Sequence, residues 1–287
     1  VAGASKGEGL GNKFLANIRE TDAIVHVVRC FDSSDIVHVA GQVDPIQDIE
    51  VINLELALAD LQMVENVLPR VEKQAKLKKE FQPLVDALNR IKIHLDNNKP
   101  VRTLEFTAEE KELLKIYPFL TAKKVLYVAN VSENDLPQME NAYVQKVREY
   151  AHAEGNSVVT ICGKIEEEIA QLDQTERQEY LESLGLEESG LQRLIKASFH
   201  MLDLITYLTT GEMETRAWTI NKGTKAPEAA GKIHSDLERG FIRADVVAFE
   251  DMKKYGSRTL AKEAGKARME GKEYIVKDGD VIEFLHN

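Results

Sequence analysis

Three short runs of apolar, mostly β-branched residues constrain the fold of this chain more than any other feature. They span residues 24–30, 125–131 and 158–162, and each is typical of a buried strand. Helical patterns lie at residues 142–154 and 165–172. Because strands that alternate with helices form parallel sheets, the sequence predicts an α/β domain. In such a domain, the loops after the carboxyl ends of the strands line the ligand site.

A stretch without strand patterns interrupts this alternation between residues 48 and 98. Its apolar residues recur at intervals of three and four, in two series. The series are Leu54, Leu58, Leu61, Val64, Leu68 and Val71, followed by Leu84, Leu88, Ile91 and Leu95. They predict an antiparallel helical hairpin, a coiled-coil arm inserted into the domain. Its basic tip, residues 73–79, is either a solvated turn or a contact point for RNA or a partner protein.

The C-terminal part of the chain, residues 203–287, has a different order of patterns. Residues 216–220 and 241–249 have strand patterns, and a helical pattern lies between them at 226–239. Residues 274–284 suggest a hairpin that turns at Asp-Gly. This order predicts a small α+β domain, in which a half-open sheet packs on one helix.

The composition excludes several classes of protein. The hydrophobic fraction of 43% and the charged fraction of 30% are those of a soluble globular protein. No apolar run approaches the roughly 18 residues that span a bilayer, and the first residues lack the apolar core of a signal peptide. Cys30 and Cys162 have no metal-ligand spacing, so we expect a reduced protein in the cytoplasm. The net charge of −11 argues against a general nucleic-acid coat and against DNA as a partner, although residues 203–287 are nearly neutral.

Three segments carry candidate chemistry. The first, Gly3-Ala-Ser-Lys-Gly-Glu-Gly-Leu-Gly11, is too rich in glycine to form a stable helix or strand. The second is Asn130-Val-Ser-Glu133, directly after the second strand. The third is Cys162-Gly-Lys164, after the third strand. Taken singly, these segments also fit a flexible linker and ordinary polar loops.

The second segment lies where P-loop GTPases have an Asn-Lys-x-Asp motif, whose Asp accepts hydrogen bonds from guanine. Guanine presents two adjacent donors that a carboxylate can bridge. Adenine presents an amino donor beside the acceptor N7, which an amide side chain matches. Asn130 is retained here, whereas Val131 and Glu133 replace the Lys and the Asp, which weakens the case for guanine. The third segment lies where those enzymes place a Ser-Ala-Lys loop against the base.

Together and in order, these segments resemble the YchF-type Obg-like ATPases, ribosome-binding members of the translation-factor class of P-loop GTPases. The resemblance covers the whole chain. The first 22 residues are similar to the family's segment after its Asp-x-Ala-Gly switch motif, and Asn130-Val-Ser-Glu133 to its Asn-x-x-Glu motif. Four motifs are similar to its C-terminal TGS domain: Arg216-Ala-Trp-Thr219, Ile233-His-Ser-Asp236, Phe241-Ile-Arg-Ala244 and Asp278-Gly-Asp-Val281.

The resemblance implies a domain organisation. Residues 1–47 and 99–202 would form a nucleotide-binding domain of the P-loop NTPase type. The helical hairpin 48–98 would be inserted into it, and residues 203–287 would form a ubiquitin-like TGS domain. The family's P-loop, and the Asp that helps to hold Mg²⁺, are expected upstream of Val1. We therefore expect ATP hydrolysis from the intact protein, and weak or no ATP binding and no activity from this chain.

The resemblance also implies a function. The protein would be an adenine-specific switch that hydrolyses ATP to ADP and phosphate with Mg²⁺, and that associates with the ribosome in translation or stress regulation. The TGS domain and the arm would contact the ribosome or its RNA. The base site would comprise Asn130, Val131, Glu133, Cys162 and Gly163, and a switch loop would comprise Gly3, Gly7, Gly9 and Gly11. The alternative is a non-catalytic ribosome- or RNA-binding module with incidental nucleotide binding.

The candidate catalytic residue is His38, in the loop region after the first strand. The family's proposed catalytic histidine falls on this position, and an imidazole can orient or deprotonate water near neutral pH. The alternative is a surface histidine in an extended, valine-flanked segment. We expect His26, inside the first strand, and His234, on the C-terminal helix, to be structural.

Overall fold

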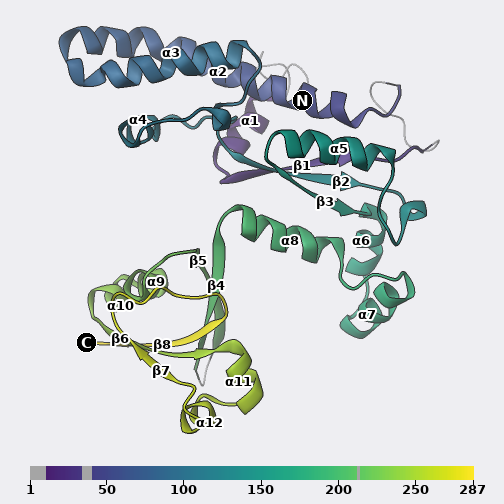
Figure 1. The fold of residues 1–287 in the computed structure, drawn as a ribbon, viewed down its shortest axis with the longest axis vertical. Coiled ribbons are helices and arrows are strands. Elements are labelled where there is room, and N and C mark those ends of the chain that lie inside the picture. The colour runs from purple at the N-terminus through teal and green to yellow at the C-terminus, as the bar shows by residue number, and fades with distance from the viewer. Residues whose placement is uncertain (1–10, 34–40, 212–213) are drawn as a thin grey trace. The chain divides into compact units, whose positions relative to one another are not determined.

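The structure is a computed structural model that describes residues 11–33, 41–211 and 214–287. Figure 1 shows its elements. The chain divides into two compact units, Val1–Ala197 and Ser198–Asn287. Each unit has its own sheet and its own apolar core, so each is described by itself.

The first unit contains a parallel sheet of three strands in the order β1-β2-β3. These are β1 (Ala23–Arg29), β2 (Lys124–Asn130) and β3 (Ser157–Ile161). The register aligns Arg29 with Asn130, and Asn130 with Ile161. All three strands therefore end at one edge of the sheet, as predicted for a parallel α/β domain, and the α/β fold class is confirmed.

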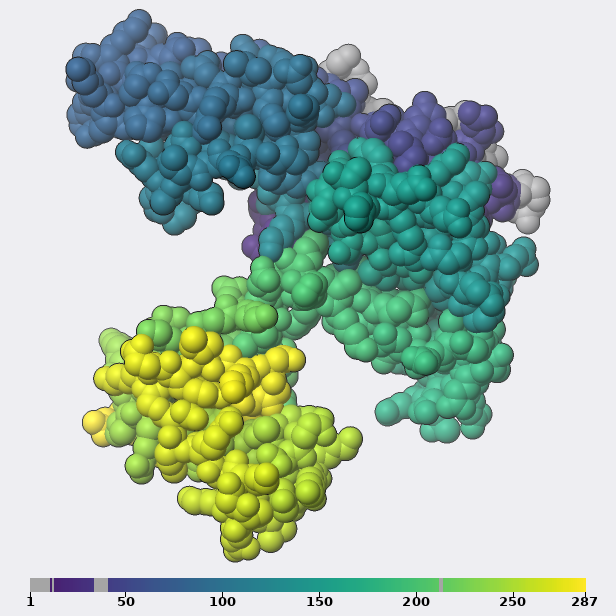
Figure 2. All heavy atoms as spheres, viewed as in Figure 1, coloured from purple at the N-terminus to yellow at the C-terminus, as the bar shows by residue number. Residues whose placement is uncertain are grey.

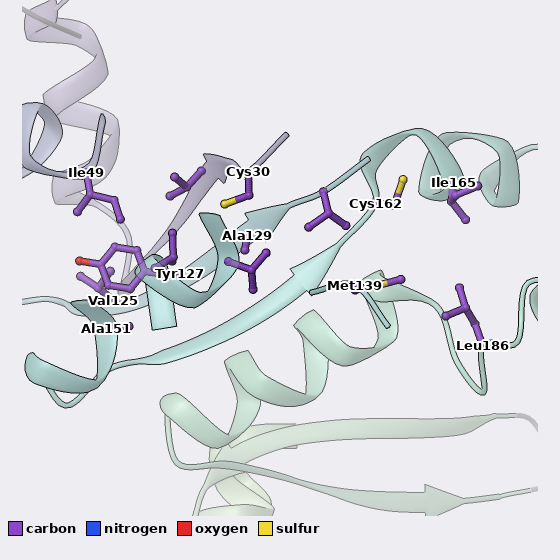
Figure 3. Packing of buried hydrophobic residues seen from close by; sticks show 14 of the residues in the cluster. Cys30, Ile49, Val125, Tyr127, Ala129, Met139, Ala151, Cys162, Ile165 and Leu186 are labelled. Atoms are coloured by element: carbon purple, nitrogen blue, oxygen red, sulfur yellow. The ribbon is translucent and has the colours of Figure 1, made fainter. Parts of the chain in front are cut away.

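The apolar runs form strands because both faces of the central strand are covered. In β2, Leu126, Tyr127, Val128 and Ala129 have no exposed surface. Helices α5 (Ala142–Ala153) and α6 (Gly163–Ala170) follow β2 and β3 along the chain, and their apolar residues join the same core. Figure 3 shows Val125, Tyr127 and Ala129 of β2 among the side chains of this core. Burial of this continuous apolar surface is the main source of the unit's stability.

The predicted arm is present as two packed helices, α2 (Pro45–Leu77) and α3 (Gln82–Asp96), joined by the short helix η2 (Lys79–Phe81). Helix α2 begins at Pro45 because the Asp44 carboxylate accepts hydrogen bonds from the backbone N–H groups of Ile46 and Gln47. Its length is about 50 Å at ~1.5 Å per residue. The later part of the first series packs against the second series, and together they bury Val64, Leu68, Val71, Leu84, Leu88, Ile91 and Leu95. Leu54 and Leu58, also predicted for this stripe, are exposed. In Figure 2 the two helices of the arm form one elongated, closely packed body.

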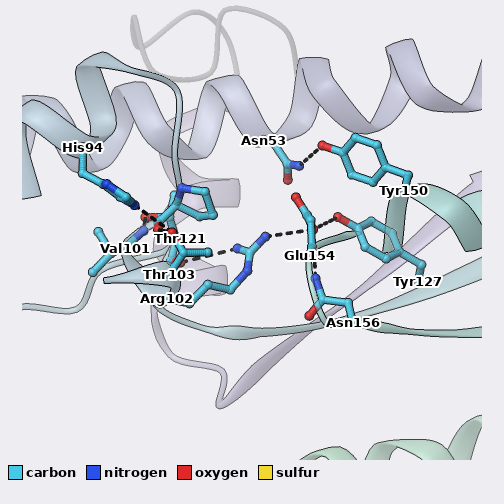
Figure 4. A network of polar contacts seen from close by, with 11 residues as sticks. Asn53, His94, Val101, Arg102, Thr103, Thr121, Tyr127, Tyr150, Glu154 and Asn156 are labelled. Carbon is cyan, nitrogen blue, oxygen red and sulfur yellow. Dashed lines mark hydrogen bonds and ion pairs between the residues drawn. The ribbon is translucent and has the colours of Figure 1, made fainter. Parts of the chain in front are cut away.

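Polar contacts join the base of the arm to the sheet, and we call this group the arm joint. Asp60 of α2 is only 1% exposed, and its carboxylate accepts three hydrogen bonds, from the backbone N–H of Leu120 and from the N–H and hydroxyl of Thr121. The Arg102 guanidinium lies 3.3 Å from the Glu154 carboxylate, which also accepts the Tyr127 hydroxyl at 2.8 Å. Figure 4 shows the contacts of Arg102, Glu154 and Tyr127. Arg102 also donates to the carbonyl of Thr121 at 3.4 Å, so Thr121 connects Asp60 of the arm indirectly to Tyr127 of β2.

Several shorter helices complete the first unit. Helix α1 (Gly11–Arg19) precedes β1, and η3 (Val101–Thr103) and α4 (Ala108–Leu114) connect the arm to β2. The loop after β2 contains η4 (Glu133–Asp135). Helix α7 (Gln174–Ser183) follows α6, and α8 (Gly190–Met201) leads to the second unit.

The second unit is an α+β domain with a mixed five-stranded sheet in the order β5-β4-β8-β6-β7. The strands are β4 (Leu204–Thr210), β5 (Thr215–Asn221), β6 (Phe241–Ala248), β7 (Arg268–Glu270) and β8 (Asp280–His286). Helix α9 (Ala226–Ile233) packs on this sheet through three buried alanines, with α10 (Ser235–Arg239) after it and α11 (Phe249–Tyr255) and α12 (Arg258–Glu263) between β6 and β7. The predicted α+β class is confirmed.

Three local predictions in this unit were wrong. The local patterns did not predict a strand at Leu204–Thr210, which is β4. The predicted single helix is broken at His234, whose Nδ1 accepts the N–H of Asp236 and starts a second helix. The predicted hairpin at residues 274–284 does not form, because β8 pairs with β6 and β4 instead. These pairings are distant in sequence, so the local Asp-Gly signal could not indicate them.

Candidate functional site

The candidate site lies where the three parallel strands end, and its centre is Asn130, the last residue of β2. Its backbone carbonyl accepts the N–H of Cys30 at 2.8 Å, and the next residue, Val131, donates its N–H to the carbonyl of Ile161 at 2.8 Å. The side-chain Oδ1 of Asn130 accepts the N–H of Gly163 at 2.9 Å. One residue therefore connects the loops that follow all three strands.

Gly163 is the first residue of α6 and lies close to this amide. A Cβ at position 163 would lie 3.2 Å from Oδ1 of Asn130, so the close approach favours glycine. Because the N–H of Gly163 donates to Oδ1, the amide orientation is fixed. Its Nδ2 has no hydrogen-bond acceptor among the described residues. This amide donor can bind a purine N7, so the donor set fits a nucleotide base.

Glu133 and Lys164 form an ion pair across the two loops. The Lys164 Nζ lies 2.7 Å from Oε2 of Glu133, and the two side chains are 62% and 45% exposed. The hydrogen bond and the charge of Glu133 raise the pKa of Lys164. Lys164 was not among the predicted base-site residues, since its contact with Glu133 spans 31 positions in the sequence.

The side chains of two other predicted base-site residues, Val131 and Cys162, point into the core and are almost fully buried. Burial raises the pKa of the Cys162 thiol, which favours its neutral form. A ligand at this edge could meet these two residues through their backbone, but not through their side chains. The side chains available to contact a ligand at this edge are therefore those of Asn130, Glu133 and Lys164.

The loop after β1 contributes to the same edge. Asn141, the N-cap of α5, donates its Nδ2 to the carbonyl of Cys30 at 2.8 Å. The Tyr143 hydroxyl donates to the Asp32 carboxylate, 3.1 Å from each oxygen. Burial raises the pKa of Cys30 to about 12, so its thiol is protonated at neutral pH. The sequence patterns did not single out Asn141, although an Asn before a helical pattern is a known capping signal.

His38, Gly3, Gly7 and Gly9 lie outside the described residues, and Gly11 is the first residue of α1. The ring of His26 packs 5.7 Å from the ring of Tyr127, and burial lowers its pKa. His26 is thus partly buried against Tyr127, and its lowered pKa favours the neutral imidazole.

Across residues 11–33, 41–211 and 214–287, no group of three or more His, Cys, Asp or Glu side chains is placed to hold a metal ion. In the same part of the chain, no helix is long and apolar enough to cross a membrane.

A separate polar cavity of about 210 Å³ lies at the arm joint. Arg102, whose Nε is buried and has no hydrogen-bond partner there, lines it together with Tyr150 and Glu154 (Figure 4). Asn53 of α2 also lines it and donates to the Tyr150 hydroxyl at 3.3 Å. None of the predicted base-site residues lines this cavity, so it is distinct from the edge where the strands end.

Comparison with known proteins places the whole chain in one family. The family model "YchF-GTPase_C: Protein of unknown function (DUF933)" matches residues 204–287. The chain is 56% identical over 289 residues to "Ribosome-binding ATPase YchF" of Bacillus subtilis and 53% identical over 288 residues to that of Haemophilus influenzae. Each of these alignments covers 100% of this chain and 79% of the relative.

A solved structure shows the same fold. The structure of the Schizosaccharomyces pombe YchF GTPase superposes with a TM-score of 0.84 at 34% identity, covering 96% of this chain and 75% of that one. The bacterial relatives are named ATPases, whereas this yeast protein is named a GTPase. The names therefore agree on nucleotide hydrolysis and differ in the base.

Proposed function

This chain belongs to the YchF family of ribosome-binding ATPases, and from that membership we propose that it is part of an adenine-specific switch that acts on the ribosome. The protein is an ATPase of the P-loop GTPase fold that associates with the ribosome. We further propose which base it binds, which residue is catalytic and which parts contact the ribosome. Its reaction is the hydrolysis of ATP to ADP and phosphate, and we propose a cytoplasmic location.

The observation that carries the binding of a purine base is the fixed amide of Asn130. Its Oδ1 is occupied by the N–H of Gly163, which leaves Nδ2 as a donor for the N7 of a purine. N7 is common to adenine and guanine, so Nδ2 alone does not discriminate between them. Discrimination depends on the carboxylate that would bridge the two donors of guanine. The carboxylate nearest to Asn130 in sequence, Glu133, is engaged by Lys164.

The proposed base site also includes the backbone of Val131, Cys162 and Gly163. The N–H of Val131 is bonded to Ile161, so this residue would offer its carbonyl. Gly163 keeps the loop after β3 close to the end of β2. The Gly3, Gly7, Gly9 and Gly11 segment is proposed as the switch loop, on the resemblance alone.

Catalysis is proposed to depend on His38, and the nucleotide is proposed to bind together with Mg²⁺. An imidazole at this position would orient or deprotonate the attacking water. When bound, Mg²⁺ would neutralise charge on the phosphates. Its ligands are not assigned among the described residues.

The proposed partner of the arm is ribosomal RNA. The arm tip exposes Lys73, Lys76 and Lys79, for which no ion pair is found among the described residues, and Leu77 beside them is 87% exposed. Exposed, unpaired lysines favour contact with phosphates. The same surface supports the second candidate function, a ribosome-binding module in which hydrolysis is incidental. The second unit, the proposed TGS domain, is the other proposed contact.

Phosphate release distinguishes these two functions. The full-length protein is incubated with ATP or GTP, with and without ribosomes, and phosphate is measured over time. A switch should hydrolyse ATP faster than GTP, and the ribosome should change that rate. A binding module should sediment with ribosomes while phosphate release stays at the level of a blank, which would contradict the enzymatic proposal.

A further inference from the structure

We propose that Lys164 is a specificity-determining residue, which selects against guanine by engaging the carboxylate of Glu133. The inference rests on the proposed base site at Asn130. It adds to that site a residue that acts through Glu133. Lys164 is thus a positioning residue, not a catalytic one.

The ion pair joins the loop after β2 to the loop after β3. Lys164 directly follows Gly163 at the start of α6, and Glu133 is the first residue of η4. The hydrogen bond from Gly163 to Oδ1 of Asn130 fixes the two loops relative to each other. The 2.7 Å distance between Nζ and Oε2 is typical of a charge-assisted hydrogen bond. The pair is thus a consequence of the backbone arrangement at the strand ends.

Neighbouring carboxylates have other partners. The Asp135 carboxylate caps η4 by accepting the N–H of Ser132 at 3.1 Å and its hydroxyl at 2.9 Å. Glu168 lies near enough to raise the pKa of Lys164, but its carboxylate accepts the hydroxyl of Tyr180. Glu133 is therefore the carboxylate of this loop that Lys164 engages.

The pair has different consequences for the two purines. A carboxylate that bridges the two adjacent donors of guanine must have both oxygens available and carry its charge toward the base. In this structure, one oxygen of Glu133 accepts from an ammonium group, which also neutralises its charge. Guanine would have to displace that ammonium. Adenine has no such pair of donors, so its binding does not require the ion pair to break.

The expected effect is modest, because both side chains are about half exposed or more and exposed ion pairs are weak. We expect the pair to contribute a factor of about three to five to the ratio of the GTP and ATP dissociation constants. Loss of the positive charge of Lys164 would also lower the affinity for both nucleotides, because their phosphates are negatively charged. That loss cancels in the ratio, so the ratio is the quantity to measure.

The test is a double-mutant cycle in the full-length protein, with dissociation constants for ATP and GTP measured by titration calorimetry. Lys164→Met keeps the aliphatic stem, and should lower the ratio of the GTP to the ATP constant by about three- to fivefold. Lys164→Arg should restore the ratio. In a Glu133→Gln background, Lys164→Met should leave the ratio unchanged, because no carboxylate remains to be released.

Lys196→Met is the matched control, since Lys196 is an exposed lysine paired with Glu188 on another part of the unit. It should not change the ratio. An unchanged ratio in Lys164→Met, or an equal fall in the Glu133→Gln background, would overturn the inference. The wild-type ratio separately tests the proposed adenine preference, so failure of the inference is distinguishable from failure of the proposed function.

Discussion

The amide of Asn130 and the backbone of Gly163 are joined by a hydrogen bond of 2.9 Å that links the ends of β2 and β3. The two residues lie 33 positions apart in the sequence. A Cβ at position 163 would lie 3.2 Å from Oδ1, which is tighter than most Cβ contacts. The geometry of the proposed base site therefore depends on a glycine at the start of α6.

Gly163→Ala is expected to weaken ATP binding by the full-length protein by about threefold or more, because the amide of Asn130 must move. The free energy of unfolding should change by less than about 1 kcal/mol, since alanine is favoured over glycine in a helix. Gly271→Ala is the control, because a Cβ there would meet nothing within 4 Å. Unchanged ATP affinity in Gly163→Ala would show that this contact does not position the base.

Asp60→Asn should destabilise the first unit by about 2–4 kcal/mol. The buried carboxylate accepts three hydrogen bonds, and an asparagine amide would turn a donor toward one of these donors. Urea unfolding followed by circular dichroism measures the loss. Trp218, the single tryptophan, belongs to β5, so its fluorescence should report an unchanged transition for the second unit. Asp86→Asn, at an exposed site on α3, should have little effect, and an equal loss there would contradict the role of Asp60.

Stability should fall as the pH drops through the ordinary range of histidine, and His26 should cause part of this fall. Burial lowers its pKa in the folded protein, so below about 6.5 the unfolded chain binds more protons than the folded one. Stability is then lost between that value and the lower folded pKa. His26→Gln should reduce the slope of the unfolding free energy between about pH 7 and 5.5. An unchanged slope in His26→Gln would contradict this role of His26.

His38→Ala should slow ATP turnover by about a hundredfold, the lower end of what general acid–base catalysis contributes, with little change in ATP affinity. Single-turnover hydrolysis and equilibrium binding, measured on the same preparation, separate the two effects. Unchanged turnover would contradict a catalytic role for His38 and favour a surface histidine.

Reversing the charge of the arm tip should reduce ribosome binding. In Lys73→Glu/Lys76→Glu/Lys79→Glu, co-sedimentation should weaken, and the dependence on salt should become shallower by about one phosphate contact per lysine. The same change at three exposed lysines elsewhere is the control: Lys99, Lys111 and Lys146. Equal loss in both variants would indicate a general effect of charge and not a contact at the tip.

Much of the first unit follows from local sequence patterns. The runs rich in β-branched residues mark its strands, and the apolar intervals of three and four mark the arm, because both patterns report burial directly. The second unit is less predictable. Only Leu202 and Asp203 separate helix α8 from strand β4, without the Gly or Pro that usually marks a turn. Strand β8 pairs with strands that are distant in sequence.

The candidate site shows the same limit. Its loops could be located because parallel strands end at one edge. The contact of Lys164 with Glu133, and that of Asn141 with Cys30, could not be predicted, because they join segments that only the folded sheet brings together. His38 and most of the proposed switch loop stay predictions from resemblance, outside the described residues.

The most direct test of the account is the relative affinity of the full-length wild-type protein for ATP and GTP, measured by titration calorimetry under one buffer and salt condition. We expect ATP to bind about tenfold more tightly than GTP or better, the difference expected from one well-placed set of base contacts. Equal affinities, or tighter binding of GTP, would contradict adenine recognition at the edge formed by Asn130, Glu133 and Gly163.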